Sequence, residues 1–341
     1  MHWGYTSNDE DPKGKIFEIE KQINLKTMKK YLFLLCFICA SFVAAYAQQI
    51  TFTPQWTPQS QFAGYYAALE NGYYAEAGLD VNIAYPTKSY SSISMLLDGS
   101  TDIITCELIQ AMVATDKNIK LVNLLQTTQH STLVLLARDK NIGRMAQLSG
   151  CRVGTWKVGF NEIPQMIEGQ QQLDIEWIHF INPLNLYISG AIDATLVKSY
   201  NEQVQFTMAG ITPGSALKFS DMGFDYPEDG LYVSEEFYKK NPEQCRKFAE
   251  ATRKGWEWVR NNRKEAVEIV MKYVKAENVP TNIYNQEIML DIILEAQEDE
   301  KGGKPSYTLN TEAFNKLNRT LLVHGYISNL IDFNKFTGGE L

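Results

Sequence analysis

The chain has 341 residues, of which 45% are hydrophobic and 21% are charged, and its formal net charge is −8. This composition is typical of a water-soluble globular protein, and the length is sufficient for one large domain or two of ordinary size. The acidic balance disfavours nucleic acid and anionic membrane surfaces as partners, because both carry negative charge.

Residues 1–47 contain the pattern of a secretory signal peptide. A short basic region at 28–30 precedes an apolar run at 31–43, and small residues at 45–47 form a cleavage site before Gln48. The apolar run is shorter than the roughly 20 residues that a membrane-spanning helix needs. The sequence therefore predicts a soluble protein exported to the periplasm.

Two further features of this segment bear on the exported form. Residues 1–27 lie ahead of the signal, so we interpret them as an upstream extension and Met28 as the true start. A lipid anchor on Cys36 or Cys39 is an alternative, which the bulky residues before each cysteine disfavour.

The chain from Gln48 onward keeps 26 basic and 35 acidic residues and three cysteines. Cys106, Cys151 and Cys245 are too few and too widely spaced for a disulfide framework. Buried free thiols are the favoured interpretation, and a single disulfide is the alternative.

Short apolar runs alternate with helical patterns in the first part of this chain. A strand and loop at 49–56 precede a helix at 62–78, which Gly78 closes. The alternation then continues with strands at 79–86, 101–107 and 119–126 and helices at 92–100 and 108–118. Such a βαβα order predicts a mostly parallel sheet covered by helices, with a ligand crevice at the carboxyl ends of its strands.

The alternation restarts after a possible crossing strand at 132–141. Strands at 148–156, 175–180 and 190–202 and a helix at 161–170 are expected, and a strand that begins at Gly230 could cross back before a helical region. We therefore predict an α/β fold of two lobes, with 48–135 and 235–341 in lobe 1, 140–228 in lobe 2, and two crossing segments as a hinge.

The stretch PQWTPQSQFAGYY at 54–66 supplies the first binding candidates. Trp56 follows a strand, so its indole can stack on a flat ring while Gln59 and Gln61 pair with the ring's edge. The alternative is that Trp56 covers the core beneath the loop. The loop's position at a strand end favours a ligand-binding role.

Other strand ends carry further candidates. Thr105 and Glu107 end the third strand, polar residues at 126–130 follow the fourth, and Trp156 ends the first strand of lobe 2. Taken one by one, these residues could be parts of solvated loops, but together they are expected to converge on one crevice. The helix that opens after Gly159 could also present backbone N–H groups to an anion.

The triplet Tyr200-Asn201-Glu202 stands at the end of an apolar run in lobe 2 and combines an aromatic face, an amide and a carboxylate. A carboxylate can accept hydrogen bonds from an amine and a ring N–H. The alternative is a solvent-exposed glutamate in a turn.

Signatures of catalysis and metal binding are sparse. The four histidines are scattered, and neither zinc-type spacings, a nucleophile elbow nor a phosphate-binding glycine loop is present in the chain from Gln48. We therefore predict no catalytic residue, no metal and no cofactor.

Three stretches resemble the exported substrate-binding proteins of ABC importers in the thiamine-pyrimidine-precursor group, which are related to nitrate-, alkanesulfonate- and taurine-binding proteins. They are QWTPQSQFAGYYAALENGYYAEAGLDV, GAIDATLVKSYNE and YVSEEFYKKNPEQCRKFAEATRKGWEWV. The resemblance implies a type II periplasmic-binding-protein fold that closes on its ligand and delivers it to an inner-membrane permease. It also implies an aromatic sandwich from Trp56 and Tyr200 around an aminopyrimidine, with Glu202 accepting from the amine.

The chain departs from the family pattern Trp-x-Pro-Asn-x-x-His-x-Gly at two positions. Gln59 replaces the asparagine and Phe62 replaces the histidine. A eukaryotic branch of the family makes the thiamine pyrimidine from its own histidine, and this chain lacks that donor. Phe62 is counted with the expected ligand-binding residues.

The sequence therefore predicts a binding protein, expected to act as a monomer, for a thiamine pyrimidine precursor. Another small nutrient such as an alkanesulfonate, taurine or nitrate is the first alternative. A pyrimidine-forming enzyme and a ligand-sensing module are the others.

Overall fold

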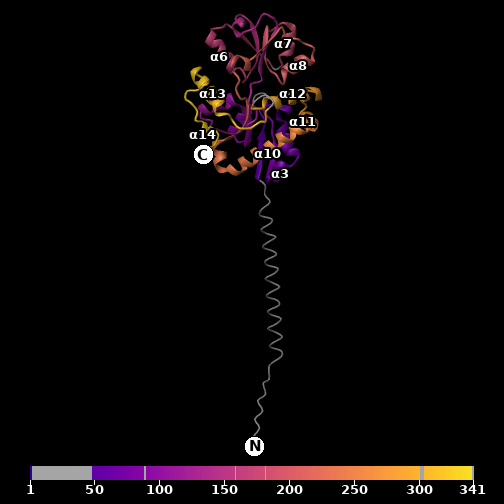
Figure 1. Ribbon diagram of the computed structural model, residues 1–341, viewed down its shortest axis with the longest axis vertical. Coiled ribbons are helices and arrows are strands. Elements are labelled where there is room, and N and C mark those ends of the chain that lie inside the picture. Colours follow the sequence, from indigo (N-terminus) through magenta and orange to yellow (C-terminus); the bar gives the residue numbers. More distant parts are fainter. Residues whose placement is uncertain (2–47, 88–89, 158, 181, 300–302, 340–341) are drawn as a thin grey trace. The chain divides into compact units, whose positions relative to one another are not determined.

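The structure is a computed structural model that describes residues 1, 48–87, 90–157, 159–180, 182–299 and 303–339 (Figure 1). The signal peptide expected at residues 1–47 thus lies, from residue 2 onward, outside the described residues. Gln49–Leu341 form one compact unit. Among the described residues, no helix has the length and apolar character needed to cross a membrane.

The described chain forms two five-stranded sheets, each at the centre of one lobe. Lobe 1 has the strand order β2-β1-β3-β10-β4, formed by β1 (Gln48–Thr53), β2 (Leu79–Ile83), β3 (Ile103–Glu107), β4 (Leu121–Gln126) and β10 (Asp229–Ser234). Lobe 2 has the order β7-β6-β8-β5-β9, formed by β5 (Leu133–Ala137), β6 (Arg152–Trp156), β7 (Glu176–Phe180), β8 (Ala194–Lys198) and β9 (Ser215–Lys218).

Helices cover both sheets. Those of lobe 2 are α6 (Glu162–Gln171), α7 (Leu184–Ser189) and α8 (Glu202–Met208), with short 3₁₀ helices η2 (Met145–Leu148) and η3 (Ser220–Met222). The others are η1 (Ser60–Phe62), α2 (Ala63–Glu70), α3 (Tyr73–Glu76), α4 (Ser92–Leu97), α5 (Leu108–Asp116), α9 (Glu235–Lys240), α10 (Pro242–Asn261), α11 (Arg263–Ala276), α12 (Ile283–Ala296), α13 (Thr311–Val323) and α14 (Phe333–Phe336). Figure 1 places α6, α7 and α8 at one end of this unit and α3 and α10 at the other.

The α/β two-lobed fold is confirmed, but the sheets are mixed rather than mostly parallel. In lobe 1, β10 runs antiparallel to both β3 and β4, and in lobe 2, β5 runs antiparallel to both β8 and β9. Both reversed strands follow directly on a segment that crosses between the lobes. Because the other strands end at the cleft, a strand that starts there must run the opposite way.

A strand is present at 132–141, but the prediction that it crosses between the lobes is wrong. β5 lies inside the lobe 2 sheet, where all five of its residues are buried. The lobes are joined instead by residues 127–132 between β4 and β5 and by residues 219–228 between β9 and β10. The exact lobe limits given above remain a prediction.

The helix expected at 62–78 is divided. It is observed as η1, α2 and α3, with a break at Gly72, whose φ of 76° lies in the left-handed region that favours glycine. Gly64 in α2 lets the helix approach α10, because a Cβ there would stand 2.2 Å from the Trp256 ring. This close packing holds α2 against α10, and the preceding loop is held by the Ser60 backbone N–H, which donates to Oε1 of Gln286 in α12 at 2.6 Å.

Two large hydrophobic clusters form the core. One lies in lobe 1 around Phe52, Phe248 and Trp256. The other runs from lobe 1 into lobe 2, since it joins Met112 of α5 to Ile163 of α6. The lobes therefore share buried apolar surface beside the cleft.

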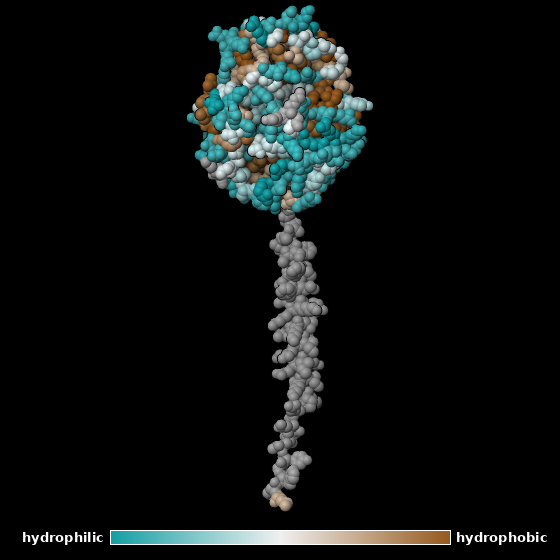
Figure 2. Space-filling model, in the orientation of Figure 1, coloured by the Kyte–Doolittle hydropathy of each residue, from teal (hydrophilic) through white to brown (hydrophobic). Residues whose placement is uncertain are grey.

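The surface and the cysteines agree with an ordinary globular domain. On the face drawn in Figure 2, hydrophilic residues cover most of the surface and apolar residues lie in separate groups. Cys106, Cys151 and Cys245 all carry free thiols.

Candidate ligand-binding cleft

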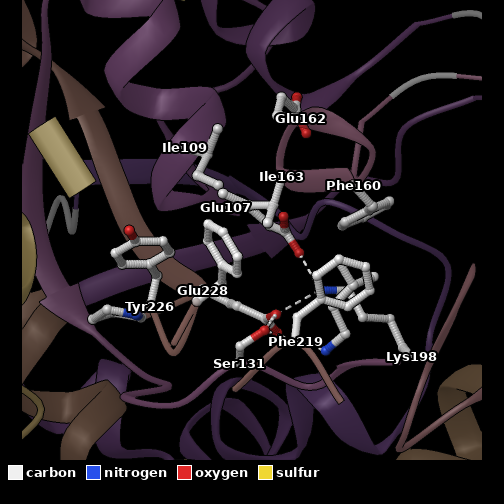
Figure 3. A pocket seen from close by; sticks show the side chains of 13 residues that line it. Glu107, Ile109, Ser131, Phe160, Glu162, Ile163, Lys198, Phe219, Tyr226 and Glu228 are labelled. Atoms are coloured by element: carbon white, nitrogen blue, oxygen red, sulfur yellow. Dashed lines mark hydrogen bonds and ion pairs between the residues drawn. The ribbon is translucent and has the colours of Figure 1, made fainter. Parts of the chain in front are cut away.

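Charged side chains from both lobes meet at the carboxyl ends of the strands. Lys198 ends β8 in lobe 2, and its Nζ lies 2.6 Å from Oε1 of Glu107, which ends β3 in lobe 1. The same Nζ lies 3.0 Å from Oε1 of Glu228 in the second crossing segment. Figure 3 shows the two carboxylates converging on the ammonium. This junction therefore links lobe 1, lobe 2 and the hinge.

A small pocket surrounds the junction. Its lining combines acidic, aromatic and aliphatic side chains: Glu107, Ile109, Ser131, Leu133, Phe160, Glu162, Ile163, Lys198, Phe219, Phe224, Tyr226, Pro227 and Glu228. Its volume is about 30 Å³, well below the roughly 150 Å³ of a cavity that admits a benzene ring. A ring-sized ligand can therefore enter only when the lobes separate or these side chains rearrange.

The electrostatics of the junction follow from an excess of carboxylates. Burial alone would lower the pKa of Lys198, but Glu107 and Glu228 outweigh burial and raise it. Burial raises the pKa of Glu107 well above its usual value, and the charges of Glu228 and Asp229 raise it further. The pKa values of Lys198 and Glu107 are thus both raised, because several carboxylates surround a single ammonium group.

Glu228 also ties the two crossing segments together. Its carboxylate accepts hydrogen bonds from Ser131 Oγ (2.9 Å), from the Thr132 backbone N–H (3.0 Å) and from Thr132 Oγ1 (2.6 Å). A second link lies nearby, where His130 Nδ1 is 2.7 Å from Asp225 Oδ2. The hinge is thus cross-linked by acidic groups of one segment and donors of the other.

Phe160 lies beside the ammonium in a strained conformation. Its φ of 67° places a bulky residue in the left-handed region, which typically costs on the order of 1 to 3 kcal/mol. Lys198 Nζ is 4.8 Å from the centre of the Phe160 ring, a cation–π distance. The strained backbone holds an aromatic face in the pocket.

Three predicted site residues of lobe 2 form one hydrogen-bonded group. Glu202 Oε1 accepts from Trp156 Nε1 and from Asn201 Nδ2, each at 3.3 Å, and its Oε2 accepts from the Lys198 backbone N–H at 3.0 Å. Glu202 is 8% exposed, and burial raises its pKa. The structure therefore brings Trp156, Asn201 and Glu202 together. Both oxygens of Glu202 already accept hydrogen bonds from other groups of the protein.

The polar loop of lobe 1 forms a separate group around Asp229. Gln59 Nε2 donates to Gln61 Oε1 at 2.5 Å, and Gln61 Nε2 donates to Asp229 Oδ2 at 2.6 Å. Gln55 Nε2 donates to Asp229 Oδ1 at 2.8 Å, and the Gln55 backbone N–H donates to Thr105 Oγ1 at 2.8 Å. Burial raises the pKa of Asp229. Gln59, Gln61 and Thr105 are thus buried and hydrogen-bonded to other residues of lobe 1.

The three aromatic candidates have different surroundings. Trp56 is 43% exposed, Phe62 is buried in the lobe 1 core, and Tyr200 of lobe 2 packs into that same core. None of these three is among the described residues that line the pocket. The sandwich of Trp56 and Tyr200 stays a prediction.

Several residues at the junction were not among the expected site residues. Lys198, Glu228 and Asp229 were missed, although a lysine at the end of an apolar strand is an unusual buried residue and could have served as a signal. In the acidic pair Glu228-Asp229, Glu228 ends the second crossing segment and Asp229 begins β10, and the sequence indicated only a turn there. The distance of 121 residues between Glu228 and Glu107 hides the contact from sequence reasoning.

A larger groove lies outside the cleft. It has a volume of about 440 Å³ and runs along β4 and α10, where Arg246 lines it. Arg246 is already paired with Glu243 and Glu250. We place the candidate site in the cleft because charged groups of both lobes meet there. Within the part of the chain that the structure describes, no group of three or more His, Cys, Asp or Glu side chains is arranged to hold a metal ion.

Two lobes joined by two crossing segments, with polar groups at the cleft, define the class of periplasmic-binding-protein folds. The aliphatic sulphonate binding protein SsuA from Escherichia coli has this fold and matches with a TM-score of 0.60 at 15% identity, over 84% of this chain and 91% of that chain. The Candida albicans CA3427 gene product, described as having the generic periplasmic binding protein fold, matches with a TM-score of 0.59 at 13% identity, over 85% and 94%.

The family follows from the sequence comparison. The model of the NMT1/THI5-like family matches residues 59–266, which is more than half of the chain, and the chain belongs to this family. A formylaminopyrimidine-binding protein of Halalkalibacterium halodurans is 27% identical over 255 residues, which cover 72% of this chain and 77% of the relative. The 4-amino-5-hydroxymethyl-2-methylpyrimidine phosphate synthase THI13 of Saccharomyces cerevisiae is 25% identical over 227 residues, which cover 62% and 67%.

Proposed function

We propose that this chain is an exported substrate-binding protein of an ABC importer that captures a thiamine pyrimidine precursor of the formylaminopyrimidine or hydroxymethylpyrimidine type. The lobes close around the ligand, and the loaded protein, a monomer, delivers it to an inner-membrane permease. One observation carries the proposal: Lys198 of lobe 2 meets Glu107 of lobe 1 at the strand ends, so the cleft is a place where both lobes can act on one small molecule.

The ligand class is supported by family membership and by the relative that binds formylaminopyrimidine. In this proposal the amine of the pyrimidine donates to a buried carboxylate, and flat apolar side chains contact the ring. Burial in the closed cleft strengthens both interactions because water is excluded.

Binding rather than synthesis is supported by residue 62. The position where the family pattern has a histidine is Phe62, which is 1% exposed and packed in the lobe 1 core. A phenylalanine offers no nitrogen for transfer to a pyrimidine. We therefore propose no catalytic step and no cofactor for this chain.

Titration of the purified protein with formylaminopyrimidine and hydroxymethylpyrimidine tests the proposal. We expect a change in tryptophan fluorescence and a melting temperature that rises with ligand concentration, because a ligand that binds only the folded state stabilises it. The recovered ligand should be chemically unchanged. A response to taurine, nitrate or an alkanesulfonate instead of the pyrimidines would contradict the ligand assignment, and a converted product would contradict the binding role.

A further inference from the structure

The lining of the pocket is acidic. Three carboxyl groups, those of Glu107, Glu162 and Glu228, line it together with one ammonium, that of Lys198. Two more buried carboxyl groups lie close by, because Glu202 accepts from the Lys198 backbone and the charge of Asp229 raises the pKa of Glu107. An anionic ligand would therefore meet several like charges and one cation that is already paired twice.

The N-terminus of α6 at the pocket is also occupied by one of the protein's own carboxylates. Glu162 begins α6, and its carboxylate interacts with the backbone N–H groups of Phe160, Asn161 and Glu162 itself. Glu202 begins α8, and its carboxylate accepts from the backbone N–H of Lys198 at the end of β8, at 3.0 Å. A helix N-terminus favours an anion, and at α6 the protein already supplies one. The anion site expected after Gly159 is thus taken by Glu162.

Glu107 differs from the other carboxylates in its unused acceptor capacity. Both oxygens of Asp229 accept from glutamine side chains, and both oxygens of Glu228 accept from residues 131–132. Glu107 is 5% exposed, and its Oε1 is bonded to Lys198. Its Oε2 receives no hydrogen bond from any residue in the described part of the chain. Because Glu107 lines the pocket, this oxygen is an acceptor that a ligand donor can use.

We propose that Glu107 is the residue that sets the ligand class of the cleft, by accepting a hydrogen bond from an amine or amidine group of an uncharged or cationic ligand, while the surrounding carboxylates exclude anions. Lys198 serves as the counter-ion that keeps Glu107 and Glu228 in place. Phe160 provides an aromatic face next to this acceptor. The inference deepens the proposed function and rests on it for the location of the site.

Equilibrium binding to the purified full-length protein tests this assignment with a panel of defined probes. Formylaminopyrimidine and hydroxymethylpyrimidine are uncharged and carry an amine, agmatine and putrescine are cationic, and hydroxymethylpyrimidine phosphate, ethanesulfonate and nitrate are anionic. We expect the best amine-bearing probe to bind at least tenfold more tightly than hydroxymethylpyrimidine phosphate, and we expect no binding of ethanesulfonate or nitrate.

Glu107→Gln removes the charge with little change in shape. Glu107→Asp keeps the charge but moves the carboxylate away from the pocket, because its side chain is one methylene shorter. We expect Glu107→Gln to lower the affinity for the best amine-bearing probe by about tenfold or more, which is typical of a hydrogen bond to a charged group. Glu107→Asp should lower affinity while still rejecting the anionic probes. The matched control is Glu236→Gln, an exposed glutamate on α9, which should bind as the unmodified protein does. Melting curves of each variant establish that it is folded.

The outcomes separate the two proposals. If no pyrimidine binds but agmatine or putrescine does, and Glu107→Gln weakens that binding, the thiamine-precursor function fails and the present inference holds. If the pyrimidines bind the folded Glu107→Gln variant with unchanged affinity, or if the phosphate ester binds as tightly as the uncharged pyrimidines, the present inference is overturned and the function remains. The absence of binding by every amine-bearing probe also overturns it.

Discussion

Two buried polar clusters lie at the same end of the strands and differ in whether both oxygens of their central carboxylate accept hydrogen bonds. In the cluster around Asp229, both carboxylate oxygens are satisfied within lobe 1, because Gln55 and Gln61 each donate to one of them, and the unpartnered atom among the described residues is the amide oxygen of Gln55. The cluster around Glu107 joins the two lobes through Lys198 and leaves one carboxylate oxygen without a donor among the described residues. A buried polar residue at a strand end is therefore a candidate for ligand binding only when some of its hydrogen-bonding capacity remains free.

The largest effect is expected from removing the cation between the lobes. Lys198→Met leaves Glu107 and Glu228 buried without their counter-ion, so we expect the free energy of unfolding to fall by about 3 to 5 kcal/mol. Urea denaturation measures the change. Lys239→Met is the matched control, because Lys239 pairs with Glu235 at the surface with half of its side chain exposed, and it should have a much smaller effect. Equal losses in the two variants would show that the junction adds no special stability.

The second effect concerns the cluster around Asp229. Asp229→Ala leaves the side-chain amides of Gln55 and Gln61 without their acceptor, and we expect a loss of about 2 to 3 kcal/mol in unfolding free energy. Asp221→Ala, at an exposed aspartate in η3, is the control. If the folded Asp229→Ala variant lost more ligand affinity than Glu107→Gln does, the distinction between the two clusters would be wrong.

A third effect is a decline of stability with rising pH. Burial raises the pKa values of Glu202 and Asp229, so the folded state keeps protons that the unfolded state releases above about pH 4. Their contribution to the free energy of unfolding therefore falls as pH rises from about 4 through the raised folded values. Urea denaturation at a series of pH values should show this decline. Glu202→Gln should reduce its slope, and an unchanged slope would mean that Glu202 does not titrate in this range.

The smallest effect is expected at the hinge, outside both clusters. The hydrogen bond that His130 donates to Asp225 raises the pKa of His130, so this pair stabilises the folded state fully below about pH 6.5 and loses that contribution as pH rises through the raised folded value. Both side chains are more than a third exposed, which makes the effect modest. His130→Gln should remove the contribution of this pair to the pH dependence of stability in this window. The Lys239→Met variant should keep it.

Much of the fold could be predicted from the sequence because it depends on local pattern. The alternation of apolar runs and helical periods indicated two α/β lobes, and Gly78 was expected to end a helix, where α3 indeed ends nearby at Glu76. The direction of β5 and β10 could not be predicted, since it depends on which side of a sheet a strand enters after crossing. Gly72 was also missed, although its positive φ divides the expected helix.

The site was harder to predict than the fold. Glu107, Trp156, Asn201 and Glu202 were predicted as site residues near strand ends; Glu107 lines the pocket, Trp156 and Asn201 donate to Glu202, and their binding roles stay predictions. Whether each has capacity left for a ligand depends on partners far away in the chain. Glu107 meets Lys198 across 91 residues, and Gln61 meets Asp229 across 168.

The sequence by itself determined the class of fold, the family and the polar character of the strand ends, because hydrophobic periodicity and short motifs are local properties. Only the tertiary structure decided which carboxylates are already satisfied and which one faces a pocket with an unused oxygen. The physical reason is that a hydrogen bond to a charged group requires contact within about 3 Å, and such contacts between distant segments form only when both lobes are folded and closed on one another.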